Sequence, residues 1–107
     1  MRGLSLGAIQ EMNEYQIEQA FVRWCKKNGI LCLKLVALSR RGFPDRTLLL
    51  PHGVVVFLEF KQPKGRVRAH QKKYEEILKK LGFAHHYVRS VEEAKEVTKQ
   101  HGNLHTT

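Results

Sequence analysis

Two apolar runs separated by a short turn limit the fold of this chain more than any other feature. Thr47 to Leu50 and Val54 to Leu58 are rich in Leu and Val, and Pro51-His52-Gly53 divides them. Such a pattern predicts an antiparallel β-hairpin. The second run continues without a break into the charged stretch 59–61. Charges that follow so apolar a strand are costly to bury unless they are paired or bound to metal.

Three charged residues are expected to meet at the end of this hairpin. Successive side chains of a strand point to opposite faces, so Glu59 and Lys61 share one face while Phe60 points into the apolar layer. Asp45, the last residue of the run Gly42-Phe43-Pro44-Asp45, directly precedes the partner strand. Two carboxylates beside an ammonium suit Mg²⁺ or Mn²⁺ and a substrate phosphate. The combination predicts metal-dependent cleavage of phosphodiesters, although each piece alone is typical of a solvated strand face or a turn.

The charge of the chain favours a polyanionic partner. Nineteen Lys and Arg residues against ten Asp and Glu give a formal net charge of +9, which is typical of proteins that bind nucleic acid. Basic residues also bracket the acids, with six of them and no acidic residue between Lys61 and Lys73. The residues expected to contact nucleic acid are Arg40, Arg41, Arg46, Lys64, Arg66, Arg68, Lys72 and Lys73.

Length and composition predict one domain, spanning residues 1–107 with a core at about 14–101. A chain of 107 residues that is 42% hydrophobic can enclose one core but not two. Cys25 and Cys32 have no metal-binding spacing and are expected to be free core thiols. No apolar stretch has the length of a signal or membrane segment, so we expect a cytoplasmic protein of a bacterial or phage-infected cell without membrane contact.

The expected order of elements is α-β-β-β-α-β-α. Capping boxes at Asn13/Gln16 and Ser90/Glu93 mark the starts of the first and last helices. The helices are expected at about 14–27, 68–81 and 91–101, and strands at 30–38, 47–50, 54–58 and 83–88. The middle helix is expected to bury Tyr74, Ile77, Leu78 and Leu81. Hairpins combined with a crossover helix require a mixed sheet with helices on its faces, which is an α/β sandwich.

The sequence permits more than one interpretation of several polar residues. Glu18 lies beside the apolar stripe of the first helix and could face the sheet edge, but a boundary glutamate is usually solvated. Gln71 lies on the inward face of the middle helix, where it could hold Lys61 or a metal-bound water, or simply pack at the core edge. His85 and His86 are adjacent in a strand and face opposite sides, so they cannot form a joint ligand pair. His70 could contact phosphate or lie on an ordinary surface.

Taken in order, Glu18, Gly42-Phe43-Pro44-Asp45, Glu59-Phe60-Lys61, Gly65 and Gln71 resemble the pattern of the VRR-NUC family, the virus-type replication-repair nucleases. The likeness covers roughly residues 14–90 and suggests a stand-alone VRR-NUC domain. The family belongs to the PD-(D/E)xK nuclease superfamily. It implies a restriction-endonuclease-like fold, with a mixed β-sheet flanked by helices.

The resemblance also implies roles for these residues. Asp45, Glu59 and the backbone carbonyl of Phe60 would hold Mg²⁺ or Mn²⁺, with Glu18 binding through water or completing a second metal site. Lys61 would orient or help to deprotonate the attacking water, and Gln71 would steady that water or Lys61.

The implied substrate is DNA, cut at branched structures by a homodimer similar to Holliday-junction resolvases, without an organic cofactor. Larger relatives carry the domain in DNA repair enzymes. The alternatives are a non-catalytic DNA-binding or junction-recognition module and an RNA-cleaving nuclease of the same fold.

Overall fold

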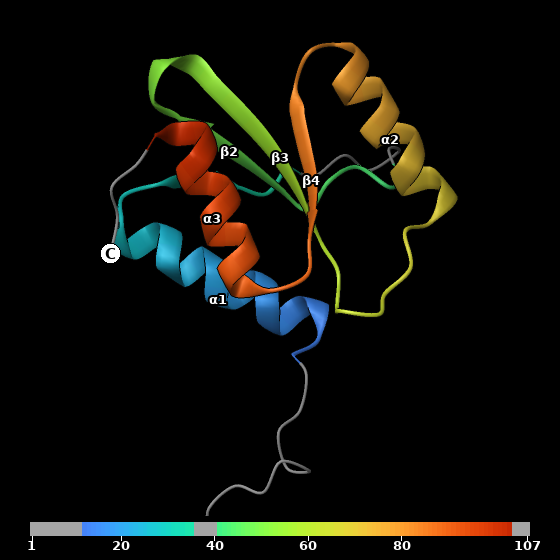
Figure 1. The fold of residues 1–107 in the computed structure, drawn as a ribbon, viewed down its shortest axis with the longest axis horizontal. Coiled ribbons are helices and arrows are strands. Elements are labelled where there is room, and N and C mark those ends of the chain that lie inside the picture. Colours follow the sequence, from blue (N-terminus) through green and yellow to red (C-terminus); the bar gives the residue numbers. More distant parts are fainter. Residues whose placement is uncertain (1–11, 36–40, 104–107) are drawn as a thin grey trace, which may run out of the picture.

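A four-stranded mixed sheet flanked by helices forms the framework of the protein (Figure 1). The computed structural model describes residues 12–35 and 41–103. Its elements are α1 (Glu14–Lys27), β1 (Leu31–Leu33), β2 (Arg46–Leu50), the 3₁₀ turn η2 (Pro51–Gly53), β3 (Val54–Phe60), α2 (Ala69–Lys80), β4 (Ala84–Val88) and α3 (Val91–Gly102). The expected α/β class and order of elements are confirmed.

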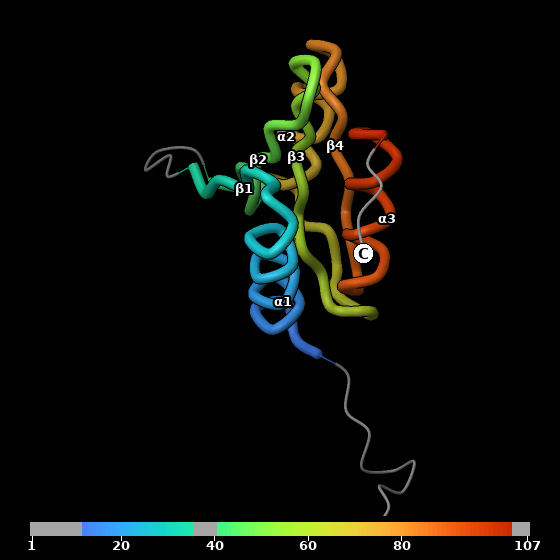
Figure 2. Tube along the Cα trace, turned by 90° about the vertical axis from the view of Figure 1, so that its left-hand side faces the viewer, coloured from blue at the N-terminus to red at the C-terminus, as the bar shows by residue number. Residues whose placement is uncertain are grey.

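The strands follow one another across the sheet from β1 to β4 (Figure 2). β2 pairs antiparallel with both β1 and β3, whereas β3 and β4 are parallel because α2 crosses over between them. The hairpin is confirmed, with Leu50 opposite Val54. Its turn places His52 and Gly53 at φ of 66° and 75°, a left-handed backbone that glycine adopts readily. The antiparallel hairpin therefore fixes which residues of β2 and β3 lie side by side.

The first strand is much shorter than expected. β1 ends at Leu33, Lys34 and Leu35 have no regular structure, and the rest of the expected strand, 36–38, lies outside the described residues. β3, by contrast, extends to Phe60, because its last two residues lie beyond the start of the antiparallel β2 and pair with β4. Among the described residues, no helix is long and apolar enough to cross a membrane.

The main core lies between one face of the sheet and the helices α1 and α3. α1 lies toward the β1 side and α3 toward β4 (Figure 2). Phe60 is 1% exposed and packs against Phe21 with ring centroids 5.6 Å apart, so its expected inward orientation is confirmed. Other core members include Ile17, Trp24, Cys25, Leu48, Leu58, Val88 and Ala94. Both cysteines are free thiols, with Cys25 buried and Cys32 half-buried.

Both expected helix starts are present, but only one capping box is complete. Asn13 and Gln16 exchange side-chain to backbone hydrogen bonds of 2.8 and 2.9 Å. Ser90 Oγ accepts from the backbone N–H of Glu93, whereas the Glu93 carboxylate accepts from the N–H of Arg89 rather than that of Ser90. At the start of α3 the return hydrogen bond of the capping box is therefore displaced by one residue, from Ser90 to Arg89. This bond connects the backbone of Arg89 to the first turn of the helix.

The opposite face of the sheet carries α2 and a cluster of aromatic rings. Phe43 contacts Phe57 and Tyr74 edge-on, with centroids 5.7 Å apart in each case. The expected apolar face of α2 is partly wrong, since Leu78 is buried but Ile77 and Leu81 are 40% and 68% exposed. α2 ends at Lys80, and Gly82 at φ 95° then turns the chain toward β4. Leu81 therefore follows the last helical turn and has no core surface to cover.

Candidate active site

The hairpin and the parallel neighbour β4 bring the expected acids together at one end of the sheet. Asp45 directly precedes β2, and its Oδ2 accepts a 2.8 Å hydrogen bond from the backbone N–H of Phe60. Glu59 lies next to Phe60 on β3 and is 4% exposed. Because Arg46 pairs with Leu58, the register leaves Asp45 beside the last residues of β3. The expected convergence of Asp45 and Glu59 is therefore present in the structure.

The two carboxyl groups share an environment that disfavours negative charge. Burial raises the pKa of Glu59 to about 8, the Asp45 carboxylate adds to this rise, and the Lys61 ammonium opposes it. Burial also raises the pKa of Asp45, whereas the hydrogen bond from the backbone N–H of Phe60 lowers it. Two adjacent carboxyls of this kind resist carrying two negative charges at once. A cation between them would remove that repulsion and displace the proton.

Lys61 occupies the first position after β3 and is 3% exposed. Its backbone N–H donates to the carbonyl of Val88 at 2.9 Å, which continues the pairing of β3 with β4 by one residue. A buried ammonium needs an anionic partner. Its charge lowers the pKa of Glu59, so the ammonium lies within electrostatic range of the acid pair.

Gln71 links the start of α2 to the acid pair. Its Nε2 donates to Glu59 Oε2 at 2.8 Å, and its Oε1 accepts from the backbone N–H of Arg68 at 2.9 Å. Both ends of the amide are used, and the accepted N–H fixes which end is the oxygen. The structure therefore brings Gln71 into contact with Glu59. The sequence suggests instead that it holds Lys61 or a metal-bound water, or packs at the core edge.

Gly42 sets the distance between the loop that carries Asp45 and the start of α2. Its φ is 90°, and a Cβ at this position would lie 2.5 Å from the backbone oxygen of His70. Glycine is thus required both by the backbone conformation and by the close approach. His70, for which a phosphate contact was one possibility, is half-buried against Gly42.

Glu18 is buried on α1, on the opposite side of the sheet from α2. Its Oε2 accepts from Arg46 Nε at 2.6 Å and lies 3.7 Å from Lys34 Nζ. Its charge also raises the pKa of Asp45, after the effect of burial. The structure therefore brings Glu18 near the acid pair but holds it through Arg46, whose side chain is only 13% exposed.

The donor set fits a hard divalent cation. Carboxylate and carbonyl oxygens are the ligands that Mg²⁺ and Mn²⁺ prefer, and burial raises the pKa values of Asp45 and Glu59, the latter despite the nearby Lys61 ammonium. Within residues 12–35 and 41–103, no group of three or more His, Cys, Asp or Glu side chains is arranged to hold a metal ion. An ion here would take its remaining ligands from the backbone, water or substrate.

Exposed cations lie close to the site residues along the chain. Lys61 is buried and so does not belong to the exposed surface, while Arg40 lies outside the described residues. Arg46 is engaged with Glu18. The other residues expected to contact nucleic acid are exposed, namely Arg41, Lys64, Arg66, Arg68, Lys72 and Lys73; we call these six the basic rim.

Two polar contacts near β4 have no counterpart among the sequence-based expectations. Tyr87 Oη donates to Glu75 Oε1 at 3.0 Å and joins β4 to α2. His86 Nε2 lies 2.8 Å from His101 Nε2 and joins β4 to α3. His85 stacks edge-on with Tyr87 instead, so the prediction that the adjacent histidines face opposite sides is confirmed. The alternation of side chains along β4 predicts that His85 and His86 face opposite sides. The neighbouring sequence does not predict the partners of Tyr87 and His86, which are Glu75 on α2 and His101 on α3.

Known structures and sequences resemble this arrangement. A solved VRR-NUC domain with 26% sequence identity superposes with a TM-score of 0.71 over 80% of this chain and 94% of that one. A second, described as a VRR-NUC domain protein, has 15% identity and a TM-score of 0.75 over 86% and 89%. The chain has the VRR-NUC fold. The family resemblance inferred from the site residues is thereby confirmed.

One curated relative is similar to this chain in sequence. "Putative nuclease p44" of Acyrthosiphon pisum secondary endosymbiont phage 1 is 40% identical over 52 residues. The match covers 49% of this chain and 56% of the relative, so the matched region spans little more than half of that protein. No protein-family model matches the chain.

Proposed function

We propose that this chain is a divalent-metal-dependent nuclease that hydrolyses DNA phosphodiester bonds. The observation that carries the proposal is the pair of desolvated carboxyls, Asp45 and Glu59, beside the buried Lys61. Glu59 and Lys61 are buried and Asp45 is half-buried. Removing these ionisable groups from water costs stability, and such a cost is typical of functional sites. The VRR-NUC fold and the phage relative support the same activity.

Each residue of the candidate site would have a separate role. Asp45, Glu59 and the carbonyl of Phe60 would hold Mg²⁺ or Mn²⁺, with Glu18 contributing through water. The bound ion supplies charge neutralisation at the scissile phosphate and a lower pKa for its water. Lys61 orients or helps to deprotonate the attacking water. Gln71 fixes the Glu59 carboxylate through its 2.8 Å hydrogen bond and so sets the position of the acid pair.

The basic rim supports a nucleic-acid substrate, because exposed lysines and arginines bind phosphates and release counterions. We further propose that the substrate is branched DNA and that the active form is a homodimer. One acid pair cuts one strand, whereas resolving a four-way junction needs two symmetric cuts. A two-fold dimer provides them by placing the same surface of each subunit against its copy.

Cleavage of a substrate panel tests this proposal. Labelled duplex, fork, flap, single-stranded and four-way-junction DNA, with matched RNA strands, would be incubated with Mg²⁺, with Mn²⁺ or with EDTA. We expect metal-dependent cleavage of DNA, strongest on branched forms. Binding without cleavage would favour a non-catalytic junction-recognition module, and preferential cleavage of RNA would favour the RNA nuclease.

Sedimentation at the assay concentration tests the dimer separately. We expect a dimer and paired nicks on the two strands of a junction. A monomer that nicks a single strand would contradict this part of the proposal.

A further inference from the structure

An irregular loop, residues 61–68, connects the two halves of the candidate active site. It starts at Lys61, at the end of β3, and leads to α2, where Gln71 contacts Glu59. The loop carries three exposed cations of the basic rim, namely Lys64, Arg66 and Arg68. Only one turn hydrogen bond lies within it, from the N–H of Gly65 to the carbonyl of Gln62, at 2.9 Å.

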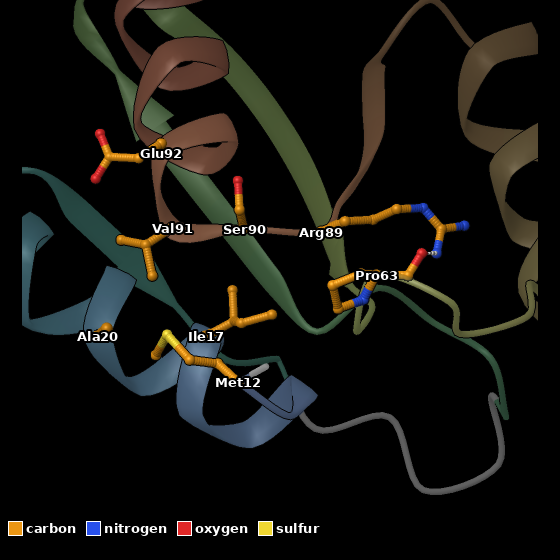
Figure 3. A pocket seen from close by; sticks show the side chains of 8 residues that line it. All are labelled: Met12, Ile17, Ala20, Pro63, Arg89, Ser90, Val91 and Glu92. Carbon is orange, nitrogen blue, oxygen red and sulfur yellow. Dashed lines mark hydrogen bonds between the residues drawn. The ribbon is translucent and has the colours of Figure 1, made fainter. Parts of the chain in front are cut away.

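Arg89 holds this loop from outside. Its Nη1 donates to the carbonyls of Gln62, Pro63 and Gly65 at 3.1, 3.3 and 2.8 Å. Figure 3 shows the side chain reaching from the connection between β4 and α3 to Pro63. Its guanidinium therefore binds the same three-carbonyl turn that the Gly65 N–H closes.

The base of Arg89 is anchored on both sides. The preceding residue, Val88, accepts the backbone N–H of Lys61, and the N–H of Arg89 donates to Glu93 at 2.7 Å. The Arg89 side chain borders a cavity of about 510 Å³ between α1 and the start of α3, with Ile17 and Val91 on its other walls. The hydrogen bonds that place the guanidinium are those to the loop carbonyls.

The placement of the guanidinium separates Arg89 from the basic rim. Its Nη1 is directed at backbone carbonyls, whereas the rim cations are exposed to solvent. A guanidinium holds its N–H donors in a rigid plane, whereas the three N–H donors of a lysine ammonium rotate at the end of a flexible stem. Arg89 thus adds charge to the molecule but acts through the loop.

We propose that Arg89 is a positioning residue that holds loop 61–68 in the conformation that presents Lys64, Arg66 and Arg68 to the DNA backbone. This rests on the proposed function. A loop ordered before binding does not have to be ordered by the DNA, so affinity rises without a new phosphate contact. Lys61 and α2 have anchors of their own, through Val88 and through Tyr87 with Glu75. Removing the Arg89 guanidinium should therefore lower DNA affinity more than it slows the chemical step.

The first test needs neither DNA nor metal. Amide exchange of Gly65 would be compared in the wild-type chain, Arg89→Ala and Arg89→Lys, with the Ile17 amide of α1 as an internal reference. We expect the Gly65 amide to exchange at least about tenfold faster in both variants, with the Ile17 amide unchanged. Unchanged exchange at Gly65 would overturn the proposal. Arg23→Ala, which removes an exposed arginine of α1, is the matched charge control.

The second test measures binding of a fluorescent fork DNA in EDTA over a salt series. We expect Arg89→Ala and Arg89→Lys to weaken binding about tenfold without changing the slope of affinity against salt. Lys64→Ala should reduce that slope by about one phosphate contact.

Cleavage kinetics in Mg²⁺ provide a further measurement. For the Arg89 variants, KM should rise while kcat stays within about threefold of wild type. A reduced salt slope in Arg89→Ala, or binding equal to that of Arg23→Ala, would overturn the role of Arg89. No binding by the wild-type chain would instead overturn the proposed function.

Discussion

The side-chain amide of Gln71 is bonded at both ends, to the Glu59 carboxylate at 2.8 Å and to the backbone of Arg68 at 2.9 Å. One residue thus caps the first turn of α2 and orients a proposed metal ligand. Any change in the position of this helix is transmitted to Glu59. Conversely, the amide leaves Glu59 one carboxylate oxygen that Gln71 does not occupy.

Replacing Gln71 with glutamate should impair catalysis strongly. The donor to Glu59 would become a second carboxylate, which repels it and can compete for the metal. We expect kcat to fall at least about a hundredfold, the scale of losing a positioned polar group in an active site. Gln62→Glu makes the same charge change in the neighbouring loop at an exposed residue. Equal loss in the two variants would mean that charge alone, rather than the contact with Glu59, explains the effect.

Glu59→Gln should stabilise the metal-free protein at alkaline pH. The pKa of Glu59 is raised from 4.5 to about 8 by burial and by Asp45, so the folded chain binds a proton that the unfolded chain has lost. This contribution to stability is present below pH 4.5 and is lost as the pH rises through about 8. Thermal unfolding in EDTA should give a Tm gain for Glu59→Gln that grows between pH 5 and 9, by about 4 °C or more.

Glu96→Gln serves as the control for this measurement, because Glu96 is exposed on α3. Its Tm difference from wild type should not vary with pH in the same way. A Glu59→Gln gain that is constant from pH 5 to 9 would contradict the raised pKa.

The histidine pair should make the fold sensitive to mild acid. The 2.8 Å contact between His86 and His101 requires at least one neutral ring. Burial, and then the charge of His101, lower the pKa of His86. This stabilising contribution is therefore present above pH 6.5, the ordinary value, and is lost as the pH falls through the lower folded pKa.

His101→Asn should flatten this acid dependence. We expect the Tm of the wild-type chain to fall more between pH 7 and 5 than that of His101→Asn, with His52→Asn, in the exposed turn, behaving like wild type. Some acid sensitivity should persist in every variant, because burial also lowers the pKa of His85. Parallel Tm curves for wild type and His101→Asn would exclude the pair as an acid-sensitive contact.

DNA binding should weaken steeply with salt. About six phosphate contacts from the basic rim imply on the order of a thousandfold loss of affinity between about 50 and 200 mM salt. Anisotropy of a labelled fork measured in EDTA gives the slope directly. A nearly flat titration would show that these exposed cations do not track the phosphate backbone.

The sequence predicted those parts of the fold and site that depend on neighbouring residues. The alternation of Glu59, Phe60 and Lys61, the turn at Pro51 and the start of α1 follow from local periodicity and capping. The convergence of Asp45 with Glu59 was also predictable, because an antiparallel hairpin fixes its own register.

Contacts between distant segments were not predictable in this way. Arg46 was expected to contact nucleic acid, yet its side chain is turned to Glu18, 28 residues earlier in the chain. Arg89 carries no motif, and its partners lie 24 to 27 residues away. Leu81 matched the helical period of α2, but periodicity does not show where a helix ends or which part of it meets a core.

The most direct test of the central claim compares cleavage with binding in site variants. Asp45→Asn and Lys61→Met remove the proposed metal-ligand charge and the ammonium while retaining similar side-chain volumes, and Lys64→Ala removes an exposed cation as the control. With Mg²⁺ and a labelled four-way junction, we predict that Asp45→Asn and Lys61→Met lose cleavage by at least about a thousandfold yet bind within about threefold of wild type, because neither residue belongs to the basic rim. Lys64→Ala should bind less tightly but still cut. Near wild-type cleavage by Asp45→Asn or Lys61→Met would contradict the account.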